Sequence, residues 1–351
     1  MNSFIDPTRR FMGQPPRVGV ALGYIDVGKG QEARFQDQLP QMLRALAVEA
    51  RVESIRASTA IEGYDVPTAR ADALAQPKPA RVRNRNEQEF AGYRDALDGL
   101  MRQSSQEPLT VPFVLHLHRQ MFHHSGGRGG YLKSEDNVIA SYDEHGDRHI
   151  IFEPPGHTKT ETLLQELFSR YNEACAHELA HPVLLVGALV LDFLAIHPVL
   201  DGNGRLARLI TAHELLRHGY GVVRYISLEQ RIFETKNTYY SALQRSQDGW
   251  HQAAHDIWPW VEYLTTTLRD AYKDFEARAG SNSDITGISM KERTRRHVLA
   301  LPNGASVTLA ELRRALPDIG DETLRVALRS LRDEGAAIPY GTGRGAKWIR
   351  Q

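Results

Sequence analysis

The sequence predicts a mainly helical protein with one β-hairpin and a small C-terminal α+β domain. Three observations lead to this class. Apolar residues recur with helical spacing from Thr160 to about Arg278, while the β-prone runs before them are confined to residues 137–152. The end of the chain has a separate pattern of helices followed by a pair of strands. A length of 351 residues suits two or three domains with a sizeable core.

Composition excludes several classes of protein. The 43 basic and 43 acidic side chains give no net charge, so any affinity for nucleic acid or an acidic membrane must be local. The single cysteine, Cys175, excludes an intramolecular disulfide framework and is typical of a reducing compartment. The longest apolar run, residues 182–196, contains Asp192 and is shorter than the ~20 residues of a membrane span. No signal-peptide core follows Met1. We expect a cytoplasmic protein with no membrane partner, and a homodimer is compatible with the sequence.

Four regions are expected along the chain. Residues 1–110 form an N-terminal region, in which the Gly- and Pro-rich residues 1–30 are an irregular arm and residues 31–63 are helical. Residues 111–278 form a helical core that contains the hairpin of residues 137–152. Composition marks residues 279–287 as a linker, and residues 288–351 form the last domain.

The stretch "IHPVLDGNGRLAR", Ile196 to Arg208, joins two of the predicted helices. Pro198 ends the first helix, because the residue before a proline avoids the α conformation. The second begins near Gly204 or Arg205. An Asn-Gly turn between helices is not a hairpin turn, and the stretch lacks the alternating oxygen ligands of a calcium loop. A glycine-rich turn that leads into a helix N-terminus is an anion site.

The side chains of this stretch suit phosphate chemistry. Arg205 and Arg208, one helical turn apart, bring two guanidinium groups to the anion. Asp201 offers a carboxylate of the kind that holds Mg²⁺ together with phosphates. His197 at the edge of the loop is a candidate general base.

The same residues resemble the central motif of the Fic family: His-Pro-Phe, two residues of which the second is acidic, Gly-Asn-Gly-Arg, and Arg three residues later. Only Val199 differs, where Phe is usual. The resemblance extends from about Ser58 to Tyr263 and implies a helical Fic core that transfers AMP from ATP to a protein hydroxyl with Mg²⁺. His197 would be the base, Asp201 the metal ligand, and the nucleotide would be bound by Gly202, Asn203, Gly204, Arg205, Arg208 and Tyr239.

Two further segments gain roles from this resemblance. The hairpin of residues 137–152 resembles the family's flap, which would hold the target protein as an added strand. "STAIEGY" contains Ser58, Glu62 and Gly63 of the family's inhibitory motif. By that resemblance Glu62 pairs with Arg208 and denies it to the γ-phosphate of ATP. In some family members the equivalent Glu also supports removal of AMP, so a bifunctional enzyme stays open.

The last domain resembles the winged-helix domains appended to Fic proteins. The candidate DNA-contacting residues are Arg325, Arg329 and Arg332 of its last helix and Arg344, Lys347 and Arg350 of the predicted wing. A DNA partner and a protein partner are both open for this domain.

Two functions therefore compete: an AMP-transferring enzyme with an appended recruiting domain, and a DNA-binding regulator whose Fic core only senses nucleotide. The intact histidine and acidic ligand favour the enzyme.

Overall fold

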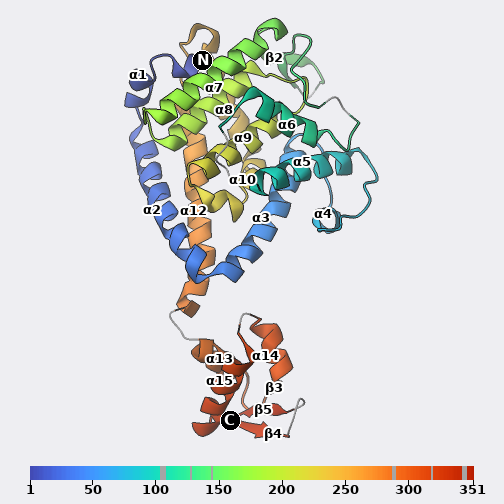
Figure 1. Cartoon of the computed structure of the whole chain (residues 1–351), viewed down its shortest axis with the longest axis vertical. Helices are drawn as coiled ribbons and strands as arrows, with labels where there is room; N and C mark the ends of the chain where they lie inside the picture. Colours follow the sequence, from blue (N-terminus) through green and yellow to red (C-terminus); the bar gives the residue numbers. More distant parts are fainter. Residues whose placement is uncertain (103–107, 127–128, 144, 287–289, 318, 342–345) are drawn as a thin grey trace. The chain divides into compact units, whose positions relative to one another are not determined.

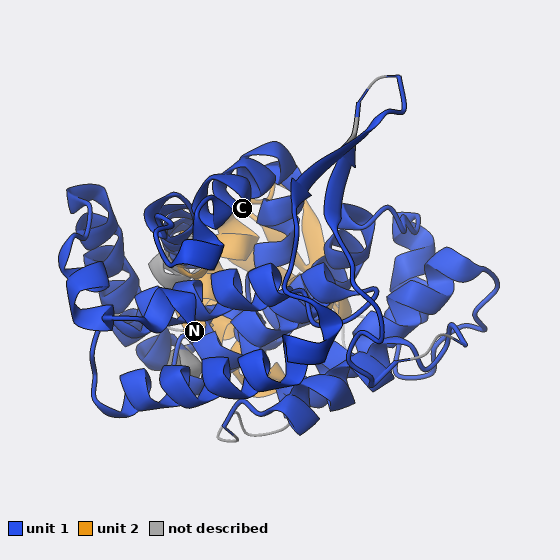
Figure 2. Cartoon of the chain, turned by 90° about the horizontal axis from the view of Figure 1, so that it is seen from above, with its two compact units in different colours: residues 1–275 blue, residues 276–351 orange. Residues whose placement is uncertain are grey.

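The computed structural model describes residues 1–102, 108–126, 129–143, 145–286, 290–317, 319–341 and 346–351. The chain divides into two compact units, Met1–Phe275 and Glu276–Gln351 (Figure 2). Both are mainly helical, as the sequence predicts, and the strands form two small antiparallel sheets. No helix in these ranges is both long enough and apolar enough to span a membrane.

Helices make up most of the first unit (Figure 1). Its α-helices are α1 (Pro7–Met12), α2 (Pro16–Gln38), α3 (Pro40–Ile61), α4 (Thr68–Ala75), α5 (Arg85–Arg102), α6 (Val111–Met121), α7 (Thr160–Ala176), α8 (Pro182–Ile196), α9 (Asn203–Arg217), α10 (Leu228–Glu234), α11 (Lys236–Gln247) and the part of α12 (Trp258–Thr286) up to Phe275. Its 3-10 helices are η1 (Asn2–Phe4), η2 (His157–Lys159), η3 (Gly221–Arg224) and η4 (Trp250–Gln252), and its strands are β1 (Ile139–Tyr142) and β2 (Arg148–Phe152).

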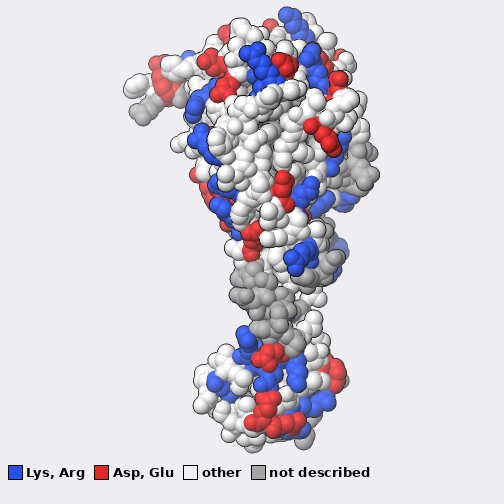
Figure 3. Space-filling model, turned by 90° about the vertical axis from the view of Figure 1, so that its left-hand side faces the viewer, with Lys and Arg blue, Asp and Glu red and all other residues white. Residues whose placement is uncertain are grey.

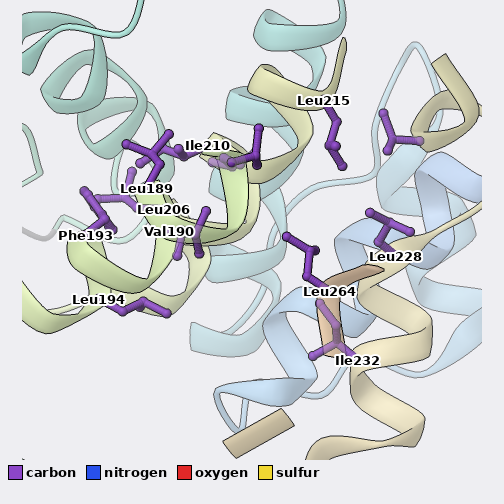
Figure 4. Close-up of a cluster of buried hydrophobic side chains, with 14 of the residues drawn as sticks. Leu189, Val190, Phe193, Leu194, Leu206, Ile210, Leu215, Leu228, Ile232 and Leu264 are labelled. Atoms are coloured by element: carbon purple, nitrogen blue, oxygen red, sulfur yellow. The ribbon is translucent and has the colours of Figure 1, made fainter. Parts of the chain in front are cut away.

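The helix pair α8 and α9 lies at the centre of this unit. Residues 183–196 of α8 are all buried, and so is nearly all of α9. A helix that is apolar on every face must be surrounded by others. Figure 4 shows the packing, in which side chains of α8 and α9, among them Val190 and Leu206, lie in one cluster with side chains of α10 and α12 such as Ile232 and Leu264. The loop of residues 197–202 between α8 and α9 is therefore held from both ends by the core.

The N-terminal segment is helical, so the expectation of an irregular arm over residues 1–30 is wrong. Val18, Leu22 and Ile25 of α2 are buried at helical spacing and pack in the core. Glycine lowers helix propensity by about 1 kcal/mol per residue, but tertiary burial of an apolar face outweighs that preference.

The predicted hairpin is present and projects from the helical body of the first unit (Figure 2). Its strands pair antiparallel, with Tyr142 opposite Arg148 and a register shift at Ile139. In the turn, the Asp143 carboxylate accepts hydrogen bonds from the backbone N–H groups of His145 and Asp147, each at 2.9 Å. Residue 144 lies outside the described residues. In the part of the sheet that the structure describes, β1 and β2 pair only with each other, so each has an edge open to a further strand.

The second unit contains α13 (Met290–Leu299), β3 (Ser306–Thr308), α14 (Leu309–Ala315), α15 (Asp321–Asp333), β4 (Ala337–Tyr340) and β5 (Lys347–Arg350). Its sheet has the order β3-β5-β4. The three helices and the final hairpin have the order that the sequence predicts, and β3 is an additional strand between α13 and α14. The linker expected from Ala279 is helical as far as Thr286, where it continues α12, and residue 287 lies outside the described residues. Arg344 of the predicted wing is also outside them.

Candidate active site

His197 stands at the first position after α8 in a left-handed conformation, with φ 49° and ψ 62°. Non-glycine residues rarely adopt this conformation, and it often marks a functional position. The Nδ1 atom of His197 lies 3.2 Å from the carbonyl oxygen of Leu194. A carbonyl oxygen can only accept, so Nδ1 carries the proton and Nε2 is left with a free lone pair. This is the tautomer that a general base requires.

Burial lowers the pKa of His197 to about 4. The hydrogen bond to the carbonyl of Leu194 acts in the opposite direction, and the positive charge of Lys133 lowers the pKa further. The imidazole is therefore neutral at physiological pH and able to accept a proton.

The residues after His197 give the loop its shape. Val199 is buried, and the side chain of Asn203 accepts a hydrogen bond from its N–H at 3.1 Å and donates to its carbonyl at 2.7 Å. The Asn203 side chain is thus committed to the loop, and a phosphate would meet the backbone of this residue. Gly202 has φ 91°, which favours glycine, and a Cβ there would lie 3.2 Å from Met121 and Phe122.

From the sequence, Arg205 is expected to bind phosphate, but in the structure its guanidinium is bonded to protein groups. Its guanidinium is 1% exposed and forms an ion pair with Glu89 of α5, which is fully buried. Nη2 also donates to Asp201 at 3.3 Å, and the group lies over the rings of Tyr64 and Phe122. A buried guanidinium needs such partners, so this arginine holds the loop against α5.

Asp201 has a half-exposed carboxylate, with 57% of its side chain accessible at the N-terminus of α9. No cluster of three or more metal-binding side chains occurs in the described part of the chain. A single exposed carboxylate suits Mg²⁺, because this ion keeps several waters and takes further oxygens from phosphates.

Arg208 connects α9 to the end of α3. Its guanidinium is 4% exposed, and Nη2 donates to Oε1 of Glu62 at 2.8 Å. Ser58, one turn before Glu62, accepts from Nε through its hydroxyl at 2.8 Å and from Nη2 through its carbonyl at 2.9 Å. The pair is therefore made through one carboxylate oxygen, while Ser58 accepts hydrogen bonds from two further N–H groups of the guanidinium. Nη1 is buried and has no hydrogen-bond partner among the described residues.

The Glu62 carboxylate lies over the first turn of α9. A Cβ at Gly204 would collide with its Oε1 atom, so the glycine leaves room for this close approach. Burial raises the pKa of Glu62, but the charge and hydrogen bond of Arg208 outweigh that effect and bring the pKa below its ordinary value. Gly63 follows with φ 90° and ends α3, as a C-cap glycine does. An anionic side chain thus lies at the predicted anion site.

Tyr239 is buried in a cluster of aromatic rings with Tyr240, Trp260 and Tyr263. Beside it is an internal cavity of about 30 Å³, which Arg208 also lines. A role for Tyr239 in nucleotide binding stays a prediction.

Four site residues are absent from the sequence-based set: Glu89, His118, Lys133 and Asn137. His118 is buried; its Nδ1 accepts from the N–H of Gly130 at 3.0 Å, so Nε2 donates to the carbonyl of Asp201 at 3.1 Å. Lys133 and Asn137 bond to the loop carbonyls before Asp201. All four residues lie at least sixty positions before the loop, so the spacing of the loop motif does not reveal them. The one weak sequence signal is a charged residue within the apolar pattern of a helix, as at Glu89.

Comparison with known proteins adds to this geometry. A profile of the Fic/DOC family matches residues 108–215, which include α6, the flap, α8 and the loop with most of α9. The chain contains a Fic domain over these residues. Protein adenylyltransferase Fic of Drosophila yakuba is 27% identical over 228 residues, which are 63% of this chain and 41% of that protein. Protein adenylyltransferase and cysteine protease IbpA of Histophilus somni is 26% identical over 245 residues, or 68% of this chain and 6% of the relative. The chain thus spans about two fifths of the length of the Drosophila relatives.

Solved structures of Fic proteins share the fold. A Fic family protein from Desulfovibrio desulfuricans G20 has a TM-score of 0.64 at 19% identity, and the match covers 96% of this chain and 97% of that one. A Fic domain containing signaling protein from Bacteroides thetaiotaomicron has a TM-score of 0.62 at 22% identity, and covers 74% and 98%.

In the second unit of this Fic protein, the arginines of α15 have acidic neighbours. Arg329 pairs with Glu322 at 2.8 Å and Arg332 with Asp333 at 2.8 Å, while Arg325 lies about 4 Å from carboxylates of the same helix. Basic and acidic side chains are intermixed on the face of this unit seen in Figure 3. A DNA partner for this unit stays a prediction, as does a protein partner.

Proposed function

We propose that this Fic protein transfers AMP from ATP to a hydroxyl group of a protein. The observation that carries the proposal is the state of His197, a neutral histidine whose Nδ1–H is used by a backbone carbonyl, so that Nε2 can accept a proton beside a helix N-terminus. A nucleotide sensor without catalysis needs no such base. The adenylyltransferase relatives support the same reaction class.

The reaction balances with the groups of this site. The oxygen of a Ser, Thr or Tyr hydroxyl in the target attacks the α-phosphorus of ATP, and its proton passes to Nε2 of His197. The bond between the α-phosphorus and the bridging oxygen breaks, and pyrophosphate leaves with the electron pair. The first-turn N–H groups of α9 have no helical acceptors and can bind phosphate oxygens. Strand addition to an open edge of the flap would present the target hydroxyl.

Asp201 would hold Mg²⁺ together with the phosphates, and the ion would neutralise part of their charge. We expect Asp201→Ala to lower the transfer rate at least ~10-fold and to remove most of its dependence on Mg²⁺, since one carboxylate is the protein's share of the ligands. The measurement is transfer of label from ATP over a Mg²⁺ titration, with Asp201→Asn as the matched variant of equal size. A wild-type Mg²⁺ midpoint in both variants would assign the metal to other ligands.

Glu62 is proposed as a brake on this reaction. It binds Arg208 and lies over Gly204 at the N-terminus of α9, so both a cation and an anion site that ATP needs are taken by one carboxylate. ATP bound beside Glu62 would place its γ-phosphate away from Arg208. The proposed resting enzyme is therefore inhibited by its own N-terminal region.

The pH dependence of transfer follows from the state of His197. The base must be neutral, and a pKa of about 4 keeps it so above about pH 5. We expect kcat in the Glu62→Gly background to show no loss centred near pH 6.5 as the pH falls from 8 to 5.5. A fall in kcat with an apparent pKa near 6.5 would mean that the imidazole titrates like an exposed histidine and that its burial is lost in the active form.

The alternative function is a DNA-binding regulator whose Fic core only senses nucleotide. The acidic neighbours of Arg325, Arg329 and Arg332 reduce the positive field that phosphate contacts need. We therefore favour the transferase.

A further inference from the structure

Four successive carbonyls at the catalytic loop accept hydrogen bonds from one short segment, residues 133–137. Nζ of Lys133 donates to the carbonyl of Ile196 at 3.1 Å, and its backbone N–H donates to that of Pro198 at 2.8 Å. Nδ2 of Asn137 donates to the carbonyls of His197 at 3.2 Å and Val199 at 3.1 Å. The whole path of the backbone from the end of α8 through His197 is thus fixed by two residues.

The two donors also hold each other. Nζ of Lys133 lies 2.9 Å from Oδ1 of Asn137, so the lysine orients the amide with its Nδ2 toward the loop. Lys133 is 4% exposed. A buried ammonium is costly unless its protons are bonded, and here it lies at the C-terminus of α8, where the helix dipole favours a cation.

These hydrogen bonds explain how the loop keeps His197 in an unfavourable backbone conformation. The left-handed conformation of His197 is strained for a residue with a Cβ and persists only where the surroundings over-determine it. The carbonyl of His197 itself is one of the four that are bound. The segment also leads directly into the flap, since β1 begins at Ile139, two residues after Asn137.

We infer that Lys133 and Asn137 are positioning residues that hold His197 in its reactive conformation and at a set distance from the flap. Neither residue takes part in the proton transfer. Their effect on catalysis rests on the proposed function, whereas their effect on the conformation of His197 does not. Transfer needs the target hydroxyl on the flap and the base to be in register, and these two residues are the direct link between the two elements.

The first test is kinetic, in full-length Glu62→Gly protein. Asn137→Ala and Lys133→Met should each lower kcat about 10- to 100-fold, because small misplacements of a catalytic group have effects of this size. KM for ATP should stay within about twofold, since the anion site on α9 is untouched. Lys133→Arg, which keeps a charged donor, should recover most of the rate. Glu135→Gln, on the same segment but exposed, is the matched control and should leave kcat unchanged.

The second test does not depend on activity. The ¹⁵N resonances of the imidazole of His197, assigned by their loss in His197→Gln, report the tautomer in the parent chain. We expect an Nδ1–H tautomer in the parent and in Glu135→Gln, and an altered or averaged signal in Asn137→Ala and Lys133→Met. An unchanged His197 signal in folded Asn137→Ala and Lys133→Met chains would overturn the inference, and so would an equal loss of kcat in Lys133→Arg and Lys133→Met. A Glu62→Gly chain without transfer would count against the proposed function alone, with the tautomer still deciding the positioning role.

Discussion

Glu62→Gly is expected to raise self-modification with labelled ATP about 10- to 100-fold over the parent chain. The reason is competition for one guanidinium, because Nη2 of Arg208 is bonded to Glu62 at 2.8 Å and a γ-phosphate must displace it. A hydrogen bond between charged groups contributes about 1.5–3 kcal/mol, which corresponds to this range of rates. The measurement is incorporation of label into the protein over time at fixed ATP and Mg²⁺.

Three variants separate the brake from other effects of the substitution. Glu62→Gln keeps the side-chain length without the charge and should give an intermediate rate. Arg208→Ala should not activate, because it removes the partner of the phosphate together with the anchor of the brake. The double variant Glu62→Gly/Arg208→Ala should behave like Arg208→Ala, the non-additivity expected of residues in direct contact. Equal activity of Glu62→Gly and the parent would reduce the motif at Ser58 to a helix end.

His197→Ala in the Glu62→Gly background is expected to lower transfer by at least ~100-fold, the usual contribution of a general base. Its affinity for ATP should change little, since the anion site is formed by the first turn of α9 and not by the imidazole. Transfer rates and nucleotide binding are measured on the same preparation. Transfer equal to that of Glu62→Gly would assign the base elsewhere, and a large loss of ATP affinity would place His197 on the phosphates.

The sequence predicts the parts of this site that lie close together in the chain. His197, Asp201 and the turn before α9 lie in one stretch between two helices, so spacing and residue type are enough to predict a candidate base and a candidate anion site. The pairing of Arg208 with Glu62, 146 positions apart, was predictable only through the resemblance to a family motif. The residue pattern around either position does not indicate a contact between residues so far apart in the sequence.

The rest depends on tertiary contacts that a single sequence does not record. Arg205 has the spacing of a phosphate ligand, yet a buried carboxylate on α5 holds its guanidinium. Lys133 would be expected on the surface, because an isolated lysine is rarely buried. In the structure its Nζ is buried and donates to the carbonyl of Ile196 and to the side-chain amide oxygen of Asn137. The helicity of α2 is likewise a result of packing, since its glycines oppose it.

The most direct test of AMP transfer by His197 is intact-mass spectrometry of three chains after incubation with ATP and Mg²⁺: the parent, Glu62→Gly, and Glu62→Gly/His197→Ala. We expect little addition of AMP to the parent, clear addition to Glu62→Gly, and none above the parent for the double variant. Addition of AMP to the double variant at the level of Glu62→Gly would contradict the role of His197. Absence of AMP from the folded Glu62→Gly chain, with an added target protein also unmodified, would contradict the proposed transfer.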